Sequence, residues 1–513
     1  MRVDLRKLLC VAVLVLAALP ASAVVTLPKI IGDHMVLQQG VKAPVWGKAS
    51  PGDKVTVSMC GKTVSTTACP KGRWIVNLPK MKSGGPYEMT ISDKDGPVTI
   101  KDILAGEVWM GSGQSNMQWA VKDTNNAEAE IAAANYPQIR LFYVERKVAE
   151  TPQWDCSGSW LVCTPENIPM FSAALYYFGR DLHKKLGVPM GLIHTSWGGT
   201  PAESWASAPA LEANPEFKPL LDRWADLIVK WPAAQRSYDE AVKKWEAEAA
   251  LAKSENKPEP KKPGAPQAPD SPGRPSSLYN AMIAPLVPYG VRGSIWYQGE
   301  SNAPRAYQYR ALFPAMINDW RKAWDDDFAF YFVQLANFTK RLDEPADSDW
   351  AELREAQTMT LSLPHTGQAV IIDIGDAEDI HPKNKQDVGK RLALIALAKD
   401  YGRKVEYSGP MFKSAKFGGG KSVVRFKHAD GLKTSDGQAP RGFAVAGADK
   451  KFYWADAAID GNKVVLSCKA VAEPVAVRYG WANNPNVNVY NGAGLPASPF
   501  RSDDWPGTTF GKN

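Results

Sequence analysis

The spacing of apolar and polar residues divides the chain into three stretches. From Val24 to about Asp102, apolar and polar residues alternate in short runs between turn residues, as in residues 55–59 and 87–91. Such alternation is typical of half-buried strands, so we expect an N-terminal β domain over residues 24–102. The same pattern returns after Tyr401, in residues 422–426, 443–445 and 463–467, and predicts a C-terminal β domain over residues 403–513.

In the middle stretch, residues 103–402, apolar runs alternate with amphipathic segments. The runs predict strands over residues 107–110, 190–194, 293–297, 328–335 and 369–374. The segments between them predict helices over residues 172–186, 305–324, 349–361 and 385–400. Strands that alternate with helices form a parallel sheet with helices on both faces. The sequence therefore predicts an α/β fold with a doubly wound, mostly parallel sheet and two flanking β domains.

An insertion interrupts this domain at about residues 207–276. Residues 237–255 are rich in Ala, Glu and Lys and predict a helix, and seven prolines follow between Pro258 and Pro275. A proline-rich segment is extended and semi-rigid. We interpret the insertion as a helical excursion with a mobile strap, and a lid over the functional site is the alternative.

The first 23 residues have the pattern of a secretory signal peptide. A basic start precedes an apolar stretch of about twelve residues and the small residues Ala21-Ser22-Ala23. Cleavage near Ala23 would make the protein secreted or periplasmic. No later stretch approaches eighteen consecutive apolar residues, so we expect no membrane span.

Charge and composition exclude some classes of partner. The chain has 61 Lys and Arg against 54 Asp and Glu, and its net charge of +7 falls to +5 without the three basic and one acidic residues of the signal peptide. A small excess without a basic block does not indicate nucleic-acid binding. The 18 Trp and 17 Tyr residues offer flat faces for sugar rings as well as for core packing.

The cysteines and histidines do not indicate a metal centre. No Cys/His spacing matches a structural zinc site, so no metal is expected. In an oxidising compartment two short-range disulfides could form, Cys60–Cys69 and Cys156–Cys163, which would leave Cys468 unpaired.

Polar loops follow three of the predicted strands. Ser115 lies in a Gly-Gln-Ser-Asn turn, Gly198 and Gly199 follow the second strand, and Gln-Gly-Glu-Ser-Asn at residues 298–302 follows the third. Sites in α/β sheets are built at the carboxyl ends of strands. A serine nucleophile needs a base, and glycine N–H groups or an Asn or Gln side chain can stabilise an oxyanion.

The base must be one of six histidines, and His381 is the best placed because it lies on the loop that leaves the strand 369–374. Its alternative is a turn before a helix. The other five are less suitable: His34 and His428 lie in the β domains, His183 lies inside a helix, His194 lies inside a strand as a core residue, and His365 lies before a strand.

In this order, the Ser115 turn, the Gly198-Gly199 loop, the 298–302 loop and the loop Asp379-Ile380-His381-Pro382 resemble the sialate O-acetylesterase branch of the SGNH hydrolases. Residues 479–484 and 494–500 look like the C-terminal signature of that branch, so the resemblance covers nearly the whole mature chain. Related secreted esterases act on plant polysaccharides, so the substrate is less closely specified than the family.

The resemblance implies Ser115 as nucleophile and His381 as general base. It implies oxyanion donors in the backbone N–H groups of Ser115 and of Gly198 or Gly199 and in the side chain of Asn302. Gln298 and Glu300 would shape the same loop. The two-step acyl transfer that follows requires no cofactor.

The third member of the triad departs from the superfamily pattern. There an Asp lies three residues before the His, but here that position is Glu378, and Asp379 lies two before. Either carboxylate, or a backbone carbonyl, could orient the imidazole. We favour Asp379.

The resemblance implies a carbohydrate O-acetylesterase acting on O-acetylated sialic acid. The carboxylate of that sugar favours an arginine at the pocket rim, and Arg274 and Arg305 flank plausible positions. Xylan or another acetylated polysaccharide is an alternative substrate. A non-catalytic glycan-binding protein, suggested by the Trp content and the β domains, is a further alternative.

Overall fold

The computed structural model describes residues 25–512, so the predicted signal peptide lies outside the described residues. Its centre is an 11-stranded sheet, in which seven strands follow one another in the order β13-β12-β11-β7-β10-β8-β9, and every neighbouring pair of these seven is parallel except β8 and β9. The predicted mostly parallel sheet is confirmed. The strands are β7 (Gly96–Gly113), β8 (Tyr136–Tyr143), β9 (Trp160–Cys163), β10 (Met190–Ser196), β11 (Gly293–Tyr297), β12 (Ala329–Gln334) and β13 (Thr366–Val370).

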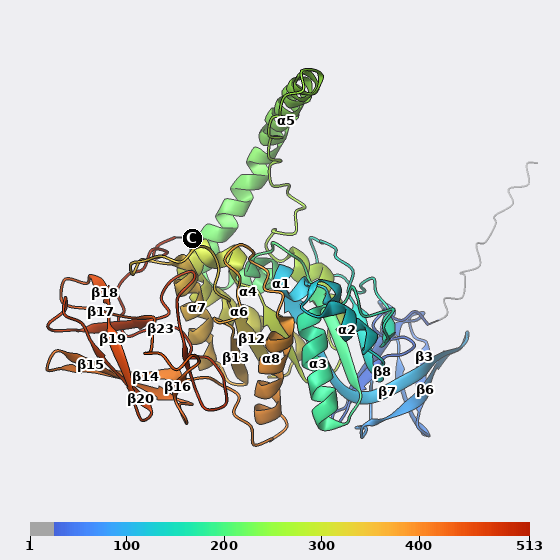
Figure 1. Cartoon of the computed structure of the whole chain (residues 1–513). Coiled ribbons are helices and arrows are strands. Elements are labelled where there is room, and N and C mark those ends of the chain that lie inside the picture. Colours follow the sequence, from blue (N-terminus) through green and yellow to red (C-terminus); the bar gives the residue numbers. More distant parts are fainter. Residues whose placement is uncertain (1–24, 513) are drawn as a thin grey trace, which may run out of the picture.

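Helices cover both faces of this sheet (Figure 1). Trp109 of β7 packs against Phe178, and Trp296 of β11 packs against Trp320. Trp296 pairs with Ser112 and therefore points to the same face as Ser112. Side chains alternate along a strand, so Trp109, three residues before Ser112, points to the opposite face. The doubly wound arrangement is therefore confirmed. The helices are α1 (Ser115–Gln118), α2 (Ala127–Ala132), α3 (Ala173–Leu186), α4 (Ala208–Glu212), α5 (Lys218–Ser254), α6 (Ala306–Trp324), α7 (Asp349–Met359) and α8 (Lys385–Lys399).

Strand β7 links the N-terminal strands to the central sheet. Its first half pairs with β6, and its second half pairs with β10 and β11, so the predicted boundary near residue 102 falls inside one continuous strand. Buried residues of the N-terminal strands and of the central sheet form one core. The N-terminal strands are β1 (Val36–Gln38), β2 (Ala43–Lys48), β3 (Lys54–Met59), β4 (Lys62–Thr67), β5 (Arg73–Leu78) and β6 (Gly84–Asp93).

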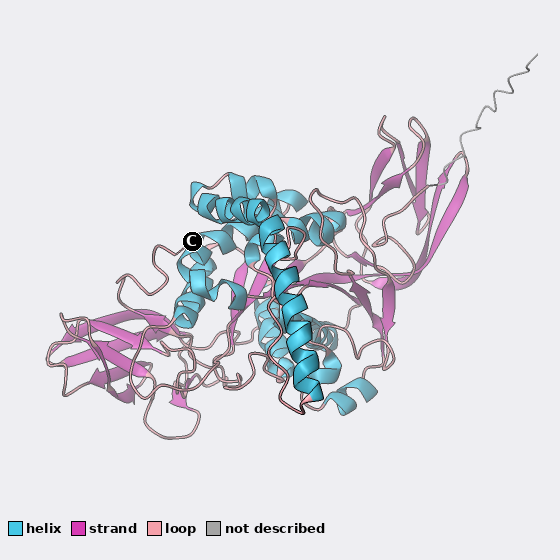
Figure 2. Ribbon diagram, turned by 90° about the horizontal axis from the view of Figure 1, so that it is seen from above, coloured by secondary structure: helices cyan, strands magenta, loops and turns pink. Residues whose placement is uncertain are grey.

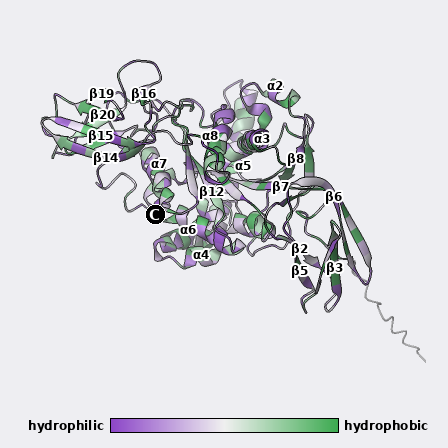
Figure 3. Ribbon diagram, turned by 90° about the horizontal axis from the view of Figure 1, so that it is seen from below, coloured by the Kyte–Doolittle hydropathy of each residue, from purple (hydrophilic) through white to green (hydrophobic). Residues whose placement is uncertain are grey.

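The C-terminal strands form two four-stranded sheets, β14-β15-β20-β19 and β18-β17-β21-β23, and the two-stranded sheet β16-β22, around a separate core. Hydrophobic and hydrophilic residues mix along these strands, as one-sided burial requires (Figure 3). The flanking β structure predicted at this end is confirmed. The strands are β14 (Met411–Gly418), β15 (Lys421–Lys427), β16 (Lys433–Thr434), β17 (Phe443–Ala446), β18 (Phe452–Trp454), β19 (Asp456–Asp460), β20 (Lys463–Ser467), β21 (Ala476–Tyr479), β22 (Val489–Tyr490) and β23 (Phe500–Arg501).

Helix α5 and strand β13 differ from their predicted bounds in ways that bear on the site. Helix α5 starts at Lys218, well before the predicted residue 237, and includes Pro232. It stands out from the body as an arm in Figure 1, and Figure 2 shows the same helix from above, where it overlaps the central domain. A proline removes one backbone donor, which an exposed helix tolerates better than a packed one. Strand β13 ends at Val370, so residues 371–374, which we expected in the strand, already belong to the connection toward His381.

The structure also bears on the cysteines and on membrane-spanning helices. All five described cysteines are free thiols, so neither of the two possible disulfides, Cys60–Cys69 and Cys156–Cys163, is formed. Burial raises the pKa of both Cys156 and Cys163 to about 12, which keeps these thiols protonated. Within residues 25–512, no helix combines the length and apolar character needed to cross a bilayer.

Candidate active site

Ser115 lies where the central strand β7 ends. Gly113 has φ +138°, and a side chain there would clash with the carbonyl oxygen of Tyr297, because a Cβ on this residue would lie 2.2 Å from that oxygen. The backbone N–H of Gln114 donates to that same carbonyl at 3.0 Å. The close contact with β11 therefore turns the chain sharply, and helix α1 begins at Ser115.

The loop after β13 brings His381 to Ser115. His381 Nε2 lies 2.9 Å from Ser115 Oγ, and the His381 ring stacks on Trp119 with 5.0 Å between ring centroids. On the other side of the ring, His381 Nδ1 lies 3.0 Å from Asp379 Oδ1. The three side chains thus form one hydrogen-bonded chain, in which the imidazole can take the serine proton and the carboxylate can stabilise the charged ring.

Asp379, and not Glu378, contacts the imidazole. Asp379 Oδ1 also accepts the backbone N–H of His381 at 2.9 Å, and the backbone and ring of His381 hold the pKa of Asp379 below its usual range. The Glu378 side chain is exposed, and within the described residues it has no hydrogen bond to His381. The difference arises because the Asp379 side chain folds back over its own loop.

The glycine loop after β10 lies directly against Ser115. A Cβ placed on Gly198 would lie 3.2 Å from Ser115 Cβ, so a larger residue at position 198 would require Ser115 to shift. The Gly198 N–H donates to Gln118 Oε1 at 2.8 Å. Gly199 has φ +73° and lines a neighbouring cavity of about 240 Å³ instead. Gly198 is therefore the glycine of this pair that faces the serine.

Asn302 and Gln298 are buried behind the site rather than in the Ser115 cavity. Asn302 Oδ1 accepts hydrogen bonds from Ala202 N and Gln298 Nε2, and Asn302 Nδ2 donates to Glu203 Oε2 at 2.9 Å. Gln298 Oε1 accepts from the hydroxyl of Tyr309. These amides join the loops after β10 and β11, and within the described residues no hydrogen bond joins the Asn302 side chain to Ser115.

Glu300 lies beneath the serine turn. Its Oε1 accepts a 2.6 Å hydrogen bond from Asn116 Nδ2, and Lys385 Nζ donates to Asn116 Oδ1 at 2.6 Å. Burial raises the pKa of Glu300 and lowers the pKa of Lys385 to about 7, the latter against the attraction of Glu300 and Asp379. Sequence reasoning placed Glu300 in this loop and Asn116 in the serine turn, but it gave neither Asn116 nor Lys385 a role, because their spacing along the chain carries no signal.

A cavity of about 500 Å³ opens in front of Ser115. Arg146 lines it, and the Arg146 guanidinium lies 5.8 Å from the centroid of the Trp197 ring. Arg274 instead pairs with Glu150, and Arg305 pairs with Glu203 in the neighbouring cavity, so neither arginine suggested by the sequence lines the Ser115 cavity. The other aromatic and charged lining residues are Trp119, Tyr143, Lys122 and Asp123.

His194 is a core residue, as predicted. It is fully buried, its Nε2 lies 2.6 Å from Ser196 Oγ, and burial followed by repulsion from Arg146 lowers its pKa to about 3. The ring is therefore neutral near pH 7, and His194 does not line the Ser115 cavity.

Comparison with known proteins agrees with this geometry. Residues 269–398 match the family described as carbohydrate esterase, sialic acid-specific acetylesterase. The sialate O-acetylesterase of Mus musculus is 31% identical over 92% of this chain and 93% of its own length. The chain belongs to the sialate O-acetylesterase family. The family enzyme of Homo sapiens is 29% identical over 92% of this chain and 91% of its own.

A solved structure extends the family comparison to the fold. A carbohydrate acetylesterase from Xanthomonas citri is 40% identical, with a TM-score of 0.79 over 94% of this chain and 100% of that one. The likeness covers the β structure at both ends as well as the central sheet. This sialate O-acetylesterase family member therefore shares a whole architecture, and not only a catalytic fragment, with a known carbohydrate esterase.

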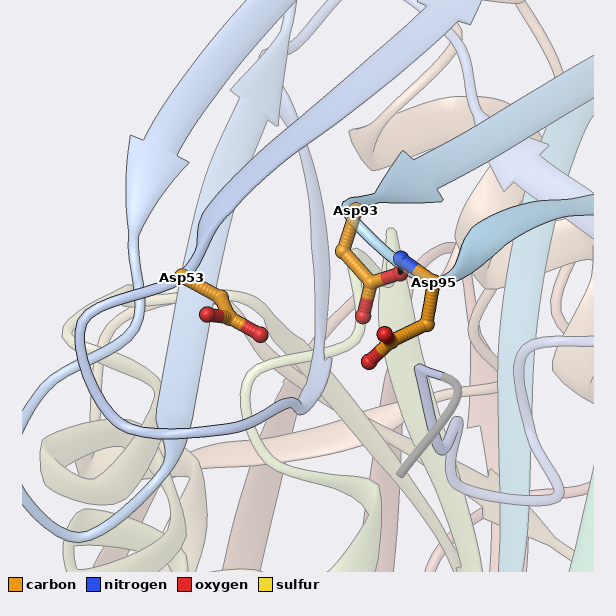
Figure 4. Close-up of side chains that lie close together, drawn as sticks. All are labelled: Asp53, Asp93 and Asp95. Atoms are coloured by element: carbon orange, nitrogen blue, oxygen red, sulfur yellow. Dashed lines mark hydrogen bonds between the residues drawn. The ribbon is translucent and has the colours of Figure 1, made fainter. Parts of the chain in front are cut away.

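One acidic cluster lies away from this site. Oxygens of Asp53, Asp93 and Asp95 lie within 4.8 Å of one another at the edge of the N-terminal strands (Figure 4). Lys94 Nζ lies 3.1 Å from Asp53 Oδ1 and already supplies a positive charge. None of these residues lines the Ser115 cavity, so the cluster takes no part in the chemistry of that site.

Proposed function

We propose that the protein releases acetate from O-acetylated sialic acid through an acetyl-enzyme on Ser115. The observation that carries this proposal is the hydrogen-bonded chain Ser115–His381–Asp379 at the mouth of a cavity, in a member of an O-acetylesterase family. His381 Nε2 accepts the proton of Ser115 Oγ while that oxygen attacks the acetyl carbonyl. The protonated ring then returns the proton to the departing sugar oxygen.

The second half of the reaction repeats the same steps with water. His381 takes a proton from water, the resulting oxygen attacks the acetyl group on Ser115, and the proton passes to Ser115 Oγ as acetate leaves. Asp379 balances the imidazolium charge in both halves.

The backbone N–H groups of Ser115 and Gly198 are our proposed oxyanion donors. Gly198 N–H is occupied by Gln118 Oε1 in the free protein, so the substrate carbonyl would replace that side chain. Asn302 donates one of its two amide N–H groups to Glu203, and we propose that it acts by fixing the two loops.

The charge of the cavity favours an acidic sugar. Arg146 and Lys122 provide two cations against the single carboxylate of Asp123, and Trp119, Tyr143 and Trp197 provide faces for the ring and its apolar substituents. A guanidinium can pair with the carboxylate of sialic acid through two parallel hydrogen bonds. We therefore assign substrate selection to Arg146.

Acetate release tests this assignment. The wild-type protein and the Arg146→Met variant would be compared on 9-O-acetylated sialic acid, acetylated xylan fragments and an aryl acetate. A charge-assisted hydrogen bond contributes about 1.5–3 kcal/mol, so kcat/KM on the sialate should fall by roughly tenfold or more while aryl acetate hydrolysis stays unchanged. Arg403→Met, an exposed arginine outside the cavity, is the matched control. Equal losses on both substrates would refute the role of Arg146.

A polysaccharide esterase is the second candidate. The Xanthomonas citri protein, 40% identical, is named a carbohydrate acetylesterase without a stated sugar, and that name fits this candidate as well as the first. Activity confined to the xylan fragments would select it. The non-catalytic alternative would require that the wild-type protein bind glycans and hydrolyse none of the three substrates, with Ser115→Ala behaving identically.

We also propose that the protein acts outside the cytoplasm, on the ground of its N-terminal sequence. N-terminal sequencing of the protein from culture supernatant or periplasm should begin near Val24. An intact Met1 in mature protein would contradict this.

A further inference from the structure

A polar connection behind the active site joins the serine turn to the histidine loop. Asn116, the residue after Ser115, is 1% exposed and donates through Nδ2 to the carbonyl of Ile380 at 3.1 Å. Lys385 Nζ donates to Asn116 Oδ1 at 2.6 Å and to the carbonyl of Pro382 at 2.7 Å. Ile380 and Pro382 are the two neighbours of His381 in the chain. The connection therefore holds His381 on both sides relative to Ser115.

Lys385 occupies an unfavourable place for a cation. Its side chain is fully buried, and it is the first residue of helix α8, where the positive end of the helix dipole repels an ammonium. Burial lowers the pKa of Lys385 to about 7, so the ammonium is held at a cost. Nothing in the start of the helix requires a lysine, because Asn384 already caps it by accepting the N–H of Asp387.

The surroundings compensate this charge only in part. Lys385 Nζ lies 5.6 Å from the Trp119 ring centroid and 5.3 Å from that of Tyr297, and the Glu300 carboxylate lies beyond Asn116. Trp119 is also the ring on which His381 stacks. Local features that break the usual rules are found chiefly at functional sites, so the place of Lys385 points to the reaction.

We propose that Lys385 is a positioning residue for the hydrolysis, acting through Asn116 and the Pro382 carbonyl to hold Ser115 Oγ and His381 Nε2 at hydrogen-bonding distance. This inference rests on the proposed roles of Ser115 and His381. Lys385 does not line the cavity, so it sets the geometry of the reacting pair and makes no contact with the sugar. A displacement of about 1 Å between reacting groups can lower a rate roughly 100-fold, which sets the size of the effect.

A double-mutant cycle on an aryl acetate tests this linkage. Lys385→Met and Asn116→Ala should each lower kcat about 100-fold with KM within about twofold, because the small substrate binds through the cavity and not through the linkage. The kcat of the double variant should be no more than about threefold below that of the less active single variant, since both changes break the same connection. Thermal unfolding of each variant identifies any loss of folded protein.

Lys399→Met is the matched control. Lys399 lies at the other end of α8 and also donates to a carbonyl, that of Thr366 at 2.7 Å, far along the helix from Ser115. Its variant should keep kcat within about twofold. If Lys385→Met does not fold, Asn116→Ala decides alone, because it removes the connection and leaves the lysine in place.

Three results would overturn the inference. The first is a folded single variant that keeps kcat within about threefold, the second is a double variant whose losses multiply, and the third is a rise in KM that accounts for the whole effect. An inactive wild-type protein, or a fully active Ser115→Ala variant, would instead overturn the proposed function and this inference with it.

Discussion

The charge of Asp379 provides a sharp test of the proposed mechanism. In Asp379→Asn the side chain keeps its size but can no longer balance an imidazolium on His381. Asp379 Oδ1 accepts two hydrogen bonds from His381, one from the ring at 3.0 Å and one from the backbone at 2.9 Å, so the change affects both the charge and the orientation of the ring.

The structure limits the size of this effect. A hydrogen bond between charged groups contributes about 1.5–3 kcal/mol, or roughly 10- to 100-fold in rate. The Asp379 side chain is 44% exposed, and water screens such a pair, so the lower part of that range applies. We expect kcat/KM for an aryl acetate to fall about 10- to 30-fold. This loss is much smaller than the roughly 10⁴-fold loss known for the buried triad aspartate of chymotrypsin-like proteases.

The assay compares Asp379→Asn with Glu378→Gln across pH 5 to 9. Glu378 is an adjacent carboxylate with an exposed side chain, so its variant should keep kcat/KM within about twofold. The hydrogen bonds to Asp379 lower its pKa, so it stays ionised as the pH falls and the ratio of the two variants should hold through the neutral range. A larger loss in Glu378→Gln would refute the assignment of Asp379, and full activity in both variants would favour a backbone carbonyl as the group that orients His381.

Three further predictions concern stability and the arm. Arg354→Met should lower the free energy of unfolding in urea by about 3 kcal/mol or more. The change removes a fully buried guanidinium that donates to four carbonyls, two of them, those of Ala482 and Asn483, in the C-terminal part of the chain. A loss under about 1 kcal/mol would contradict this. Burial lowers the pKa of His194 to about 3 in the folded protein, against an ordinary value of 6.5. Below pH 6.5 the unfolded chain therefore binds one proton more than the folded protein, and the free energy of unfolding falls as the pH drops from 6.5 toward 3. His194→Gln should show a weaker fall, and identical slopes of unfolding free energy against pH in the wild type and the variant would contradict this. Replacing residues 232–262 of the arm by a short Gly-Ser linker should keep aryl acetate kcat and Tm nearly unchanged, because only Leu220 of α5 is buried, whereas a large loss of kcat at unchanged Tm would favour the lid.

Much of the site could be predicted from the order of strands and loops. Ser115, Gly198 and Glu300 follow the neighbouring strands β7, β10 and β11, and apolar runs identify such strands without any knowledge of the fold. His381 could be predicted as the base because it was the one histidine expected on a loop beyond the carboxyl end of a strand. The arm was underestimated because Pro232 interrupts the pattern of an exposed helix whose stability does not depend on core packing.

The choices between similar groups depended on the tertiary structure. Glu378 and Asp379 are equivalent by chemistry, and only the fold of their loop directs Asp379 to the ring. Asn302 has the right chemistry for an oxyanion donor, and only the fold shows that it donates to Glu203, which lies 99 positions away in the chain. The sequence alone determined which loops meet at the sheet edge. The period of apolar residues is a local property that locates each strand, and the loops that follow parallel strands lie at the same edge of the sheet. The partners of each side chain were decided by the folded chain, because hydrogen bonds are directional and short, and contacts between distant residues leave no trace in local spacing.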